Sequence, residues 1–485
     1  MAEPLPGDPT VPAGSASPVS GTAASKAVLG RGLYYTVGTA APVLANAVVT
    51  PFVTRQLGTT EYGVVATALV VIQVGMIVAG LGLAAAITRH GILEASGVGG
   101  ARSLVLRGAA GAVVLAGLGA VSAPWTAQVI GVTQPVALVL ALVAAAGFSV
   151  VVNVQSYLRV LDKPLPFVAL SLVSALGGPL MGMALLLARH DSAAYLGGLA
   201  AGYVLASLAG LAMVVRGGPL THHVGDTRRS LRIGLPTVPH QVAIFLASGV
   251  LVLVAGWVFG AADAGRLQLA VLIGSAPGVL TSSLNNAWAP VVYRTPEDHR
   301  GVVLEHTGRD IAVLTALAAG FVALAAPLLL DVVAPATYDP RELTPTVGLV
   351  AAGTVMSVLY LCNVHLVFVS GRSEGLAVVT PVALTVGTGA AWAAGHVFGL
   401  AAVGAGMTVT YASMATGVAL LARRVSRTRW RESALVVPMS LGFVLCAAGA
   451  LLPVGHDGTL LRGAAALLAA AASLLVLVRV LRREG

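Results

Sequence analysis

The feature that most constrains this chain is a series of fourteen apolar runs separated by short polar stretches. A helix of about 20 apolar residues spans the hydrocarbon core of a bilayer. Only 10% of the 485 residues are charged and 57% are hydrophobic, whereas a soluble domain carries roughly 25% charged residues. We therefore expect an all-α integral membrane protein with about fourteen transmembrane helices. The predicted helices span 33–53, 64–88, 104–125, 136–157, 166–188, 194–215, 235–259, 267–292, 311–332, 346–369, 376–397, 400–422, 434–453 and 459–480.

The basic residues indicate how these helices cross the membrane. If the N-terminus is cytoplasmic, 23 of the 28 lysines and arginines fall in inner loops. The other five are Arg55, Arg189, Arg266, Arg341 and Arg462. Cytoplasmic loops of membrane proteins carry such an excess of positive charge, so both termini are predicted to lie inside. The net charge of +9 is then a collar facing anionic lipid headgroups, and not a nucleic-acid site.

The ends of the chain and its rarer residues add little chemistry. Residues 1–25 are rich in Pro, Gly, Ser and Ala, and are predicted to form a disordered cytoplasmic tail. Cys362 and Cys446 lie inside apolar runs, which favours two reduced thiols over a disulfide. No Cys/His cluster has the spacing of a zinc site. Neither a metal nor a cofactor is expected.

A short pattern occurs twice. Leu57–Gly63 reads L-G-T-T-E-Y-G and Phe259–Gly265 reads F-G-A-A-D-A-G, so both fit [LF]-G-x-x-[ED]-x-G with an offset of 202 residues. Each copy leads into an apolar helix that ends at an arginine, Arg89 or Arg294. Six helices separate the copies, which predicts two lobes in parallel repeat, with a substrate site between them. The expected divisions are the 1–25 tail, an N-lobe at 26–216, a C-lobe at 217–424, and two further helices at 425–485.

Several motifs carry a resemblance to a known family. They are Asn46 and Pro51, then Arg55, Leu57–Gly58 and Tyr62–Gly63, followed by GLGLAAAITR (80–89), GLPTVPH (234–240) and NNAWAPVVYR (285–294). With these motifs the chain resembles the polysaccharide flippases of the multidrug/oligosaccharidyl-lipid/polysaccharide (MOP) exporter superfamily.

The resemblance implies alternating access between two lobes. It also implies a cargo, an oligosaccharide on polyprenyl pyrophosphate, that crosses from the inner to the outer leaflet. The family often has an acid and a base partway along its seventh helix, whereas this chain reads LASGVLVLVAGW there.

Candidate site residues follow from the cargo. A pyrophosphate needs cations, and the helix-end arginines Arg55, Arg89, Arg266 and Arg294 are candidates, with snorkelling anchors as the alternative. Sugars need amides and rings, which Asn46, Gln155, Asn285, Asn286 and Trp288 offer; an interfacial tryptophan is the alternative for Trp288. Gln155, Arg159 and Lys163 recur every four residues and form one stripe at the inner end of the fourth helix. The stripe is a candidate entry for the diphosphate from the cytoplasm, with a solvated helix end as the alternative.

Three further residues are candidates for a gate or for proton coupling. Arg55 and Glu61 are close enough across the first outer turn to form an ion pair. His240 and His365 lie within spans, where coupling to protons and simple hydrogen bonding to a neighbouring helix are both open. No catalytic residue is expected.

Two rival functions are considered. A multidrug exporter usually relies on a membrane-buried carboxylate, and the first and seventh helices have none. A membrane polymerase or ligase needs a nucleophile-and-base set on an outer loop, and the longest one, 331–346, has none. The sequence thus favours a transporter over an enzyme, multi-pass in the bacterial cytoplasmic membrane. Its expected partners are the lipid-linked oligosaccharide, membrane lipids, a polysaccharide polymerase and glycosyltransferases.

Overall fold

The computed structural model describes residues 45–130, 134–221, 225–454 and 456–483, and they form helices without a strand. The predicted tail at 1–25 lies outside these residues, as does most of the first predicted helix, of which 45–56 is seen as helical. Twelve of the described helices are long and apolar enough to cross a membrane, and a bent pair raises the number to thirteen. The expected all-α membrane architecture is confirmed, while the count of fourteen and the sidedness stay predictions.

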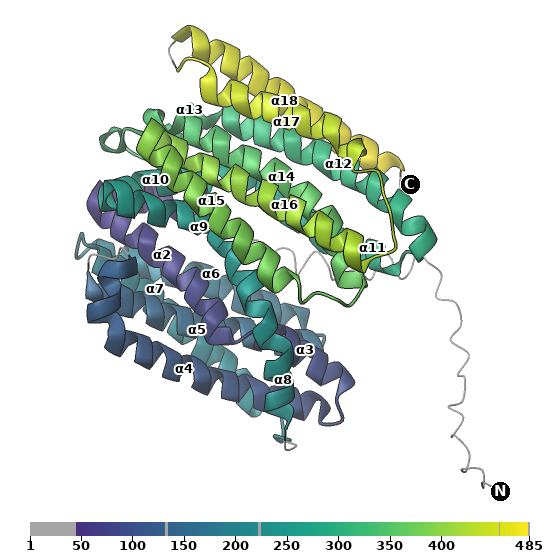
Figure 1. The fold of residues 1–485 in the computed structure, drawn as a ribbon. Coiled ribbons are helices and arrows are strands. Elements are labelled where there is room, and N and C mark those ends of the chain that lie inside the picture. Colours follow the sequence, from purple (N-terminus) through teal and green to yellow (C-terminus); the bar gives the residue numbers. More distant parts are fainter. Residues whose placement is uncertain (1–44, 131–133, 222–224, 455, 484–485) are drawn as a thin grey trace, which may run out of the picture.

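The first half of the chain forms one group of helices (Figure 1). Its members are α2 (Thr59–Gly80), α3 (Leu83–Leu93), α4 (Gly97–Ile130), α5 (Pro135–Val160), α6 (Pro164–Leu186) and α7 (Ser192–Arg216). Within this first lobe, α5 packs against α2, α4 and α7, and α6 packs against α7.

The second group begins with α9 and is built around α14. The remaining helices are α8 (Asp226–Gly234), α9 (Val238–Phe259), α10 (Ala261–Gly274), α11 (Ala276–Arg294), α12 (Glu297–Leu324), α13 (Ala326–Val333), α14 (Thr344–Val369), α15 (Leu376–Phe398), α16 (Ala405–Val425), α17 (Val436–Leu451) and α18 (His456–Arg483). Short 3-10 turns lie at Leu235–Thr237, Ala336–Tyr338, Pro340–Leu343, Leu400–Gly404 and Glu432–Leu435. Figure 1 shows α17 and α18 along the outer edge of this second lobe, where both pack on α12.

Three predicted helices differ in detail from the observed ones. The span predicted at 64–88 is the single candidate span Thr59–Ile92, but it is interrupted between α2 and α3, where Leu81 and Gly82 both take positive φ (51° and 66°). The span predicted at 267–292 is the pair α10 and α11, bent by 43°. The helix predicted from 311 begins at Glu297, because the charged inner stretch continues the same helix beyond the apolar run.

The two lobes meet where the repeated pattern predicted a turn. Helix α2 packs against α9 and α10, and the last glycine of each copy lies in this contact. A Cβ built on Gly63 would lie 1.7 Å from the carbonyl oxygen of Ala261, and one on Gly265 would lie 2.7 Å from the Gly63 nitrogen. The lobes are therefore closed against each other at the predicted outer ends of these helices, and only glycine permits such an approach.

Candidate functional site

A cleft of about 600 Å3 lies at the other, arginine-rich ends of the helices, on the predicted cytoplasmic side. We call it the inner cleft. Its lining residues are Ala84, Ala85, Thr88, Arg89, Ile92, Arg159 and Gln241. They come from α3 and α5 of the first lobe and from α9 of the second, so the cleft lies between the lobes.

Local structure explains why α3 forms one wall. The break at Leu81 and Gly82 separates α3 from α2. Gly82 packs against the chain just before α9, since a Cβ on it would lie 2.2 Å from the carbonyl oxygen of Gly234. Two of the lining residues on α3, Ala84 and Ala85, have small side chains and so leave room for the cleft.

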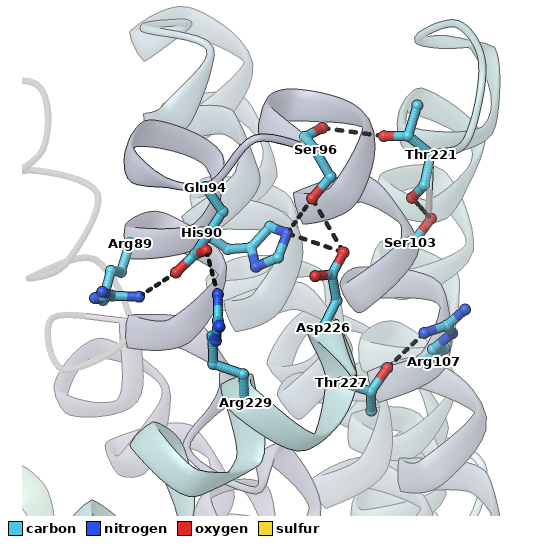
Figure 2. A network of polar contacts seen from close by, with 10 residues as sticks. All are labelled: Arg89, His90, Glu94, Ser96, Ser103, Arg107, Thr221, Asp226, Thr227 and Arg229. Carbon is cyan, nitrogen blue, oxygen red and sulfur yellow. Dashed lines mark hydrogen bonds and ion pairs between the residues drawn. The ribbon is translucent and has the colours of Figure 1, made fainter. Parts of the chain in front are cut away.

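Arg89 is the cleft cation with the most defined surroundings (Figure 2). It is about half exposed, and its Nη1 donates to the Glu94 Oε1 at 2.6 Å. The other oxygen of Glu94 lies 2.9 Å from Nη1 of Arg229 on α8. Hydrogen bonding from Arg89 is the main reason why the pKa of Glu94 is lowered from its usual value, with Arg229 adding to the effect. One carboxylate thus holds two arginines at the inner end of the cleft.

Helices α5 and α9 supply a second cation and an amide to the cleft. Arg159, at the end of α5, lies with its guanidinium 5.7 Å from the centre of the Phe167 ring and donates to the Ser156 hydroxyl at 3.0 Å. The Gln241 side-chain amide of α9 donates to the Thr237 hydroxyl at 2.9 Å. The side-chain carbonyl oxygen of Gln241 is not used in this bond. Among the lining residues there is no carboxylate.

A buried network fixes α3 relative to the segment that enters α9. Figure 2 shows the His90 ring beside Ser96 and Asp226, with Nε2 at 2.6 Å from the serine hydroxyl oxygen. The same hydroxyl donates to Asp226 at 3.1 Å. Thr221 and Thr227 add bonds to the α3–α4 loop and to α4. Helix α8 is therefore attached to the first lobe, although the chain continues from it into the second.

The structure brings only part of the predicted site together. Arg89 and Arg159 share the inner cleft, and Gln155 lies one turn before Arg159, where its amide donates to Ser171 of α6 at 2.8 Å. Arg294 is exposed at the end of α11, outside the cleft lining, and makes no hydrogen bond or ion pair with a described residue.

The predicted amides and ring lie elsewhere. Asn46 is half-buried in the first helix, and Asn286 is exposed on α11. Asn285 has a buried Oδ1 without a hydrogen-bond partner. Trp288 is 5% exposed and its indole donates to Thr307 at 2.7 Å, so it takes neither predicted role. It is a core residue of the second lobe, because burying the ring against α12 satisfies its one donor.

The two histidines bond to neighbouring helices. Nδ1 of His240 lies 3.1 Å from the Thr380 hydroxyl, and Nδ1 of His365 lies 3.2 Å from the Tyr293 hydroxyl. The Nε2 of His365 is buried without a partner. Both rings therefore have the hydrogen-bonding role that the sequence left open beside proton coupling.

The predicted ion pair between Arg55 and Glu61 is wrong. Glu61 lies in the first turn of α2 and accepts from the Ser192 backbone N–H at 2.8 Å and from the Gln134 amide at 3.2 Å. The Glu61 carboxylate thus stabilises the positive N-terminal end of α7. This partner is distant in the sequence, so the turn around Glu61 alone does not predict it. Arg55 instead donates to the carbonyl oxygens of Pro51 (2.7 Å) and of Val332 in α13 (3.3 Å), beside an outer hollow of about 530 Å3.

Arg266 lies on the same outer side as Arg55 and is not part of the inner cleft. It bonds to Asp263 (2.9 Å), Glu342 (2.5 Å) and the carbonyl oxygen of Tyr338 (2.9 Å). Arg266 thereby fastens the outer loop to α10, and its predicted contact with the cargo stays a prediction.

Three residues of the cleft region were missed by the sequence reasoning. Thr88 lies in the motif GLGLAAAITR but was not singled out. Glu94 and Arg229 come together over 135 residues of chain, and no local pattern links them. The one signal in the sequence was an acid five residues after Arg89.

Comparisons with known proteins identify the family and the fold. Residues 28–295, more than half of the chain, match the model of a family described as polysaccharide biosynthesis protein. No curated protein matches significantly. Among solved structures, a multidrug resistance MATE family transporter of the MOP superfamily in an inward-facing conformation has a TM-score of 0.61, with 17% identity over 82% of this chain and 96% of that one.

Two further structures show the same fold. The eukaryotic MATE transporter AtDTX14 has a TM-score of 0.62, with 14% identity over 86% of this chain and 99% of that one. An outward-facing structure of a MATE family transporter has a TM-score of 0.57, with 18% identity over 85% of this chain and 96% of that one.

Proposed function

The chain belongs to the polysaccharide biosynthesis protein family, among the membrane transporters of the MOP superfamily, and we propose that it is a lipid-linked oligosaccharide flippase. Its cargo is an oligosaccharide on polyprenyl pyrophosphate, taken from the inner leaflet of the bacterial cytoplasmic membrane and delivered to the outer leaflet. Glycosyltransferases supply the cargo inside, and a polysaccharide polymerase consumes it outside.

The observation that carries this proposal is the inner cleft with Arg89 and Arg159 on its walls and no carboxylate in its lining. Guanidinium groups bind phosphate oxygens in a fork of two hydrogen bonds and keep their charge at any physiological pH. The Gln241 amide and the Thr88 hydroxyl supply the neutral donors and acceptors that sugar hydroxyls require.

Glu94 gives Arg89 a way to accept the cargo at low cost. An arriving pyrophosphate competes with Glu94 for the Arg89 guanidinium. When Arg89 turns to the phosphate, Glu94 keeps its ion pair with Arg229, so no carboxylate is left unpaired in a confined place. In this proposal the exchange at Arg89 takes the place of a gate at Arg55 and Glu61, which do not pair with each other.

Alternating access requires the contacts at the two ends of the lobes to interchange. The outer ends are in close contact through Gly63 and Gly265, while the inner cleft is open between α3 and α9. In our proposal the cargo enters in this arrangement, and the outer contact then separates to release it.

The fold similarity to MATE transporters favours a second candidate, export of small molecules. Cationic drugs need a carboxylate in the binding region, whereas the lining of the inner cleft has two arginines. A polymerase or ligase is less well supported. The carboxylates of the outer loop lie against arginines: Asp331 against Arg341, and Glu342 and Asp339 against Arg266 at 2.5 and 4.0 Å. None of them lies beside a nucleophile in a set of the kind that such an enzyme needs.

Proteoliposomes that contain the purified chain distinguish these functions. We expect translocation of a fluorescent polyprenyl-pyrophosphate oligosaccharide and no uptake of a cationic dye. Arg159→Gln should lower translocation about tenfold or more, since a charged hydrogen bond of about 1.5–3 kcal/mol is lost. Arg372→Gln, an exposed inner arginine outside the cleft, is the matched control. Dye uptake without glycolipid translocation would support the exporter instead.

A further inference from the structure

A second, smaller hollow lies at the inner end of the second lobe. It encloses about 250 Å3 between the inner ends of α14 and α16 and the 426–432 loop. Its polar lining includes Asn363, Arg423, Arg429, Trp430 and Glu432, and none of these residues lines the inner cleft. We call it the loop pocket.

The loop that closes this pocket is held in a fixed shape. The Arg429 guanidinium donates to the carbonyl oxygens of Ser426, Thr428 and Arg423 at 2.7, 3.4 and 3.3 Å. The loop also touches α12 closely, because a Cβ on Gly301 would lie 2.2 Å from the carbonyl oxygen of Arg429.

The other walls are similarly tied together. The Trp430 indole donates to the Asn363 side chain at 3.4 Å, and the buried Asn363 amide donates to a carbonyl within its own helix at 3.1 Å. The pocket is therefore formed before any ligand arrives, which lowers the entropic cost of binding.

The charges in the loop pocket do not balance. Arg423 lies 3.1 Å from Glu432, which is the one carboxylate in the lining. Arg429 bonds only to neutral carbonyl groups, and no carboxylate in the described part of the chain lies within ion-pair distance of it. One positive charge thus remains uncompensated at the pocket. Arg429 is exposed, so its attraction for an anion is also weakened by salt.

We propose that the loop pocket binds the phosphate group of an anionic phospholipid from the leaflet on this side. Three more arginines of the same loop region, Arg424, Arg427 and Arg431, are exposed around it and draw anionic headgroups to the surface. At about 250 Å3 the pocket is smaller than the roughly 300–1,000 Å3 of sites for larger organic ligands. A headgroup fits it better than an oligosaccharide does, so it is separate from the cargo site.

The test is a titration of the purified full chain with phosphatidylglycerol, followed by native mass spectrometry, with phosphatidylcholine as the neutral lipid. Arg423→Gln should weaken the first bound phosphatidylglycerol about tenfold, because one charged hydrogen bond is lost. Glu432→Gln should strengthen binding, because Arg423 loses its competitor. Arg427→Gln removes the same charge outside the pocket and should change affinity less than about twofold.

Three outcomes would overturn the proposal. Equal losses in Arg423→Gln and Arg427→Gln would mean diffuse attraction to the arginine-rich surface. Displacement of the lipid by millimolar inorganic phosphate would assign the pocket to a free anion. Unchanged affinity in Glu432→Gln would show that the ion pair does not face the ligand, and this variant decides the matter even if Arg423→Gln fails to fold.

Discussion

The helix pairs α2–α3 and α10–α11 start from the same seven-residue pattern and carry an arginine near their inner ends, yet only their outer halves are alike. At the outer end the last glycines of the two patterns pack on each other's backbones. At the inner end Arg89 is held by Glu94 beside the cleft, whereas Arg294 is exposed without a described partner. Glu94 follows Arg89 by five residues, and the residue five positions after Arg294 is His299, which has no carboxylate.

The break within each pair explains the difference. Helix α2 runs 22 residues before its break, but α10 runs only 14. The first break lies against Gly234, where the chain passes from the first lobe into the second; the second break, at Ser275, does not. Both copies of the repeat thus take part in the contact that closes the lobes. The inner helices α3 and α11 differ, because only α3 lines the inner cleft.

The largest effect is expected at the shared outer contact. Gly63→Ala puts a Cβ where the Ala261 carbonyl oxygen lies, so the outer ends cannot close as they do here. Overpacking costs about 1–3 kcal/mol, and translocation in proteoliposomes should fall about tenfold or more. Gly58→Ala is the matched control in the same pattern, because nothing lies within 4 Å of its Cβ. Equal activity of the two variants would end the idea of a symmetric closing contact.

A second comparison sets the two inner arginines against each other. Arg89→Gln should lower complementation of a flippase-deficient strain about tenfold, because a charged contact with phosphate is lost. Arg294→Gln should have little effect at matched expression. Arg89→Lys should fall between the wild type and Arg89→Gln, since the charge stays but the fork of donors is lost. If Arg294→Gln lowers complementation as much as Arg89→Gln, both arginines contact the cargo, and α3 and α11 have the same role.

Replacing the acid of each pattern, Glu61 or Asp263, should lower the stability of the protein by different amounts and affect transport less. Glu61→Ala removes the acceptor of the Ser192 N–H and the Gln134 amide, and should lower stability by about 1 kcal/mol. Asp263→Ala leaves Arg266 with Glu342 and the Tyr338 carbonyl oxygen, and should cost about 0–1 kcal/mol. Thermal melts in one detergent compare them, and a larger loss for Asp263→Ala would reverse the assignment.

The smallest effect is a pH dependence confined to the first pair. The pKa of Glu94 is lowered by Arg89 and Arg229, so its contribution to stability is present above its ordinary value of 4.5 and is lost as pH falls through the lowered pKa. The difference in Tm between wild type and Glu94→Gln should therefore be seen at pH 7 and shrink below about pH 4.5. A difference that is constant over this range would show that the charge of Glu94 does not matter.

Much of the fold follows from one-dimensional patterns. The run lengths of apolar residues predicted the helices from α4 to α7 and from α14 to α18, because each span must satisfy its own backbone hydrogen bonds in lipid. The repeated glycine pattern predicted two lobes, but only the structure shows that the two copies pack against each other. The start of α12 at Glu297 was missed, because a helix continues past the membrane wherever its polar residues still favour it.

The candidate site was predictable only in part. Arg89 and Arg159 were identified by chemistry, since a diphosphate needs cations at the end of a span. Arg266 and Trp288 have equally suitable side chains, but their partners, the Tyr338 carbonyl and Thr307, lie 72 and 19 residues away. The partner of a long polar side chain depends on which helices are neighbours, and no local pattern reports that.

The sequence by itself determined the membrane-spanning helices, the repeat and the family, because hydrophobic length and glycine spacing are properties of the chain alone. The tertiary structure decided which residues of the two repeats have the same surroundings. Gly63 and Gly265 meet because both lobes present their backbones at the same height, whereas Glu94 reaches Arg229 only because α8 is attached to the first lobe. Contacts between distant segments depend on packing, and packing is fixed only once all the helices are in place.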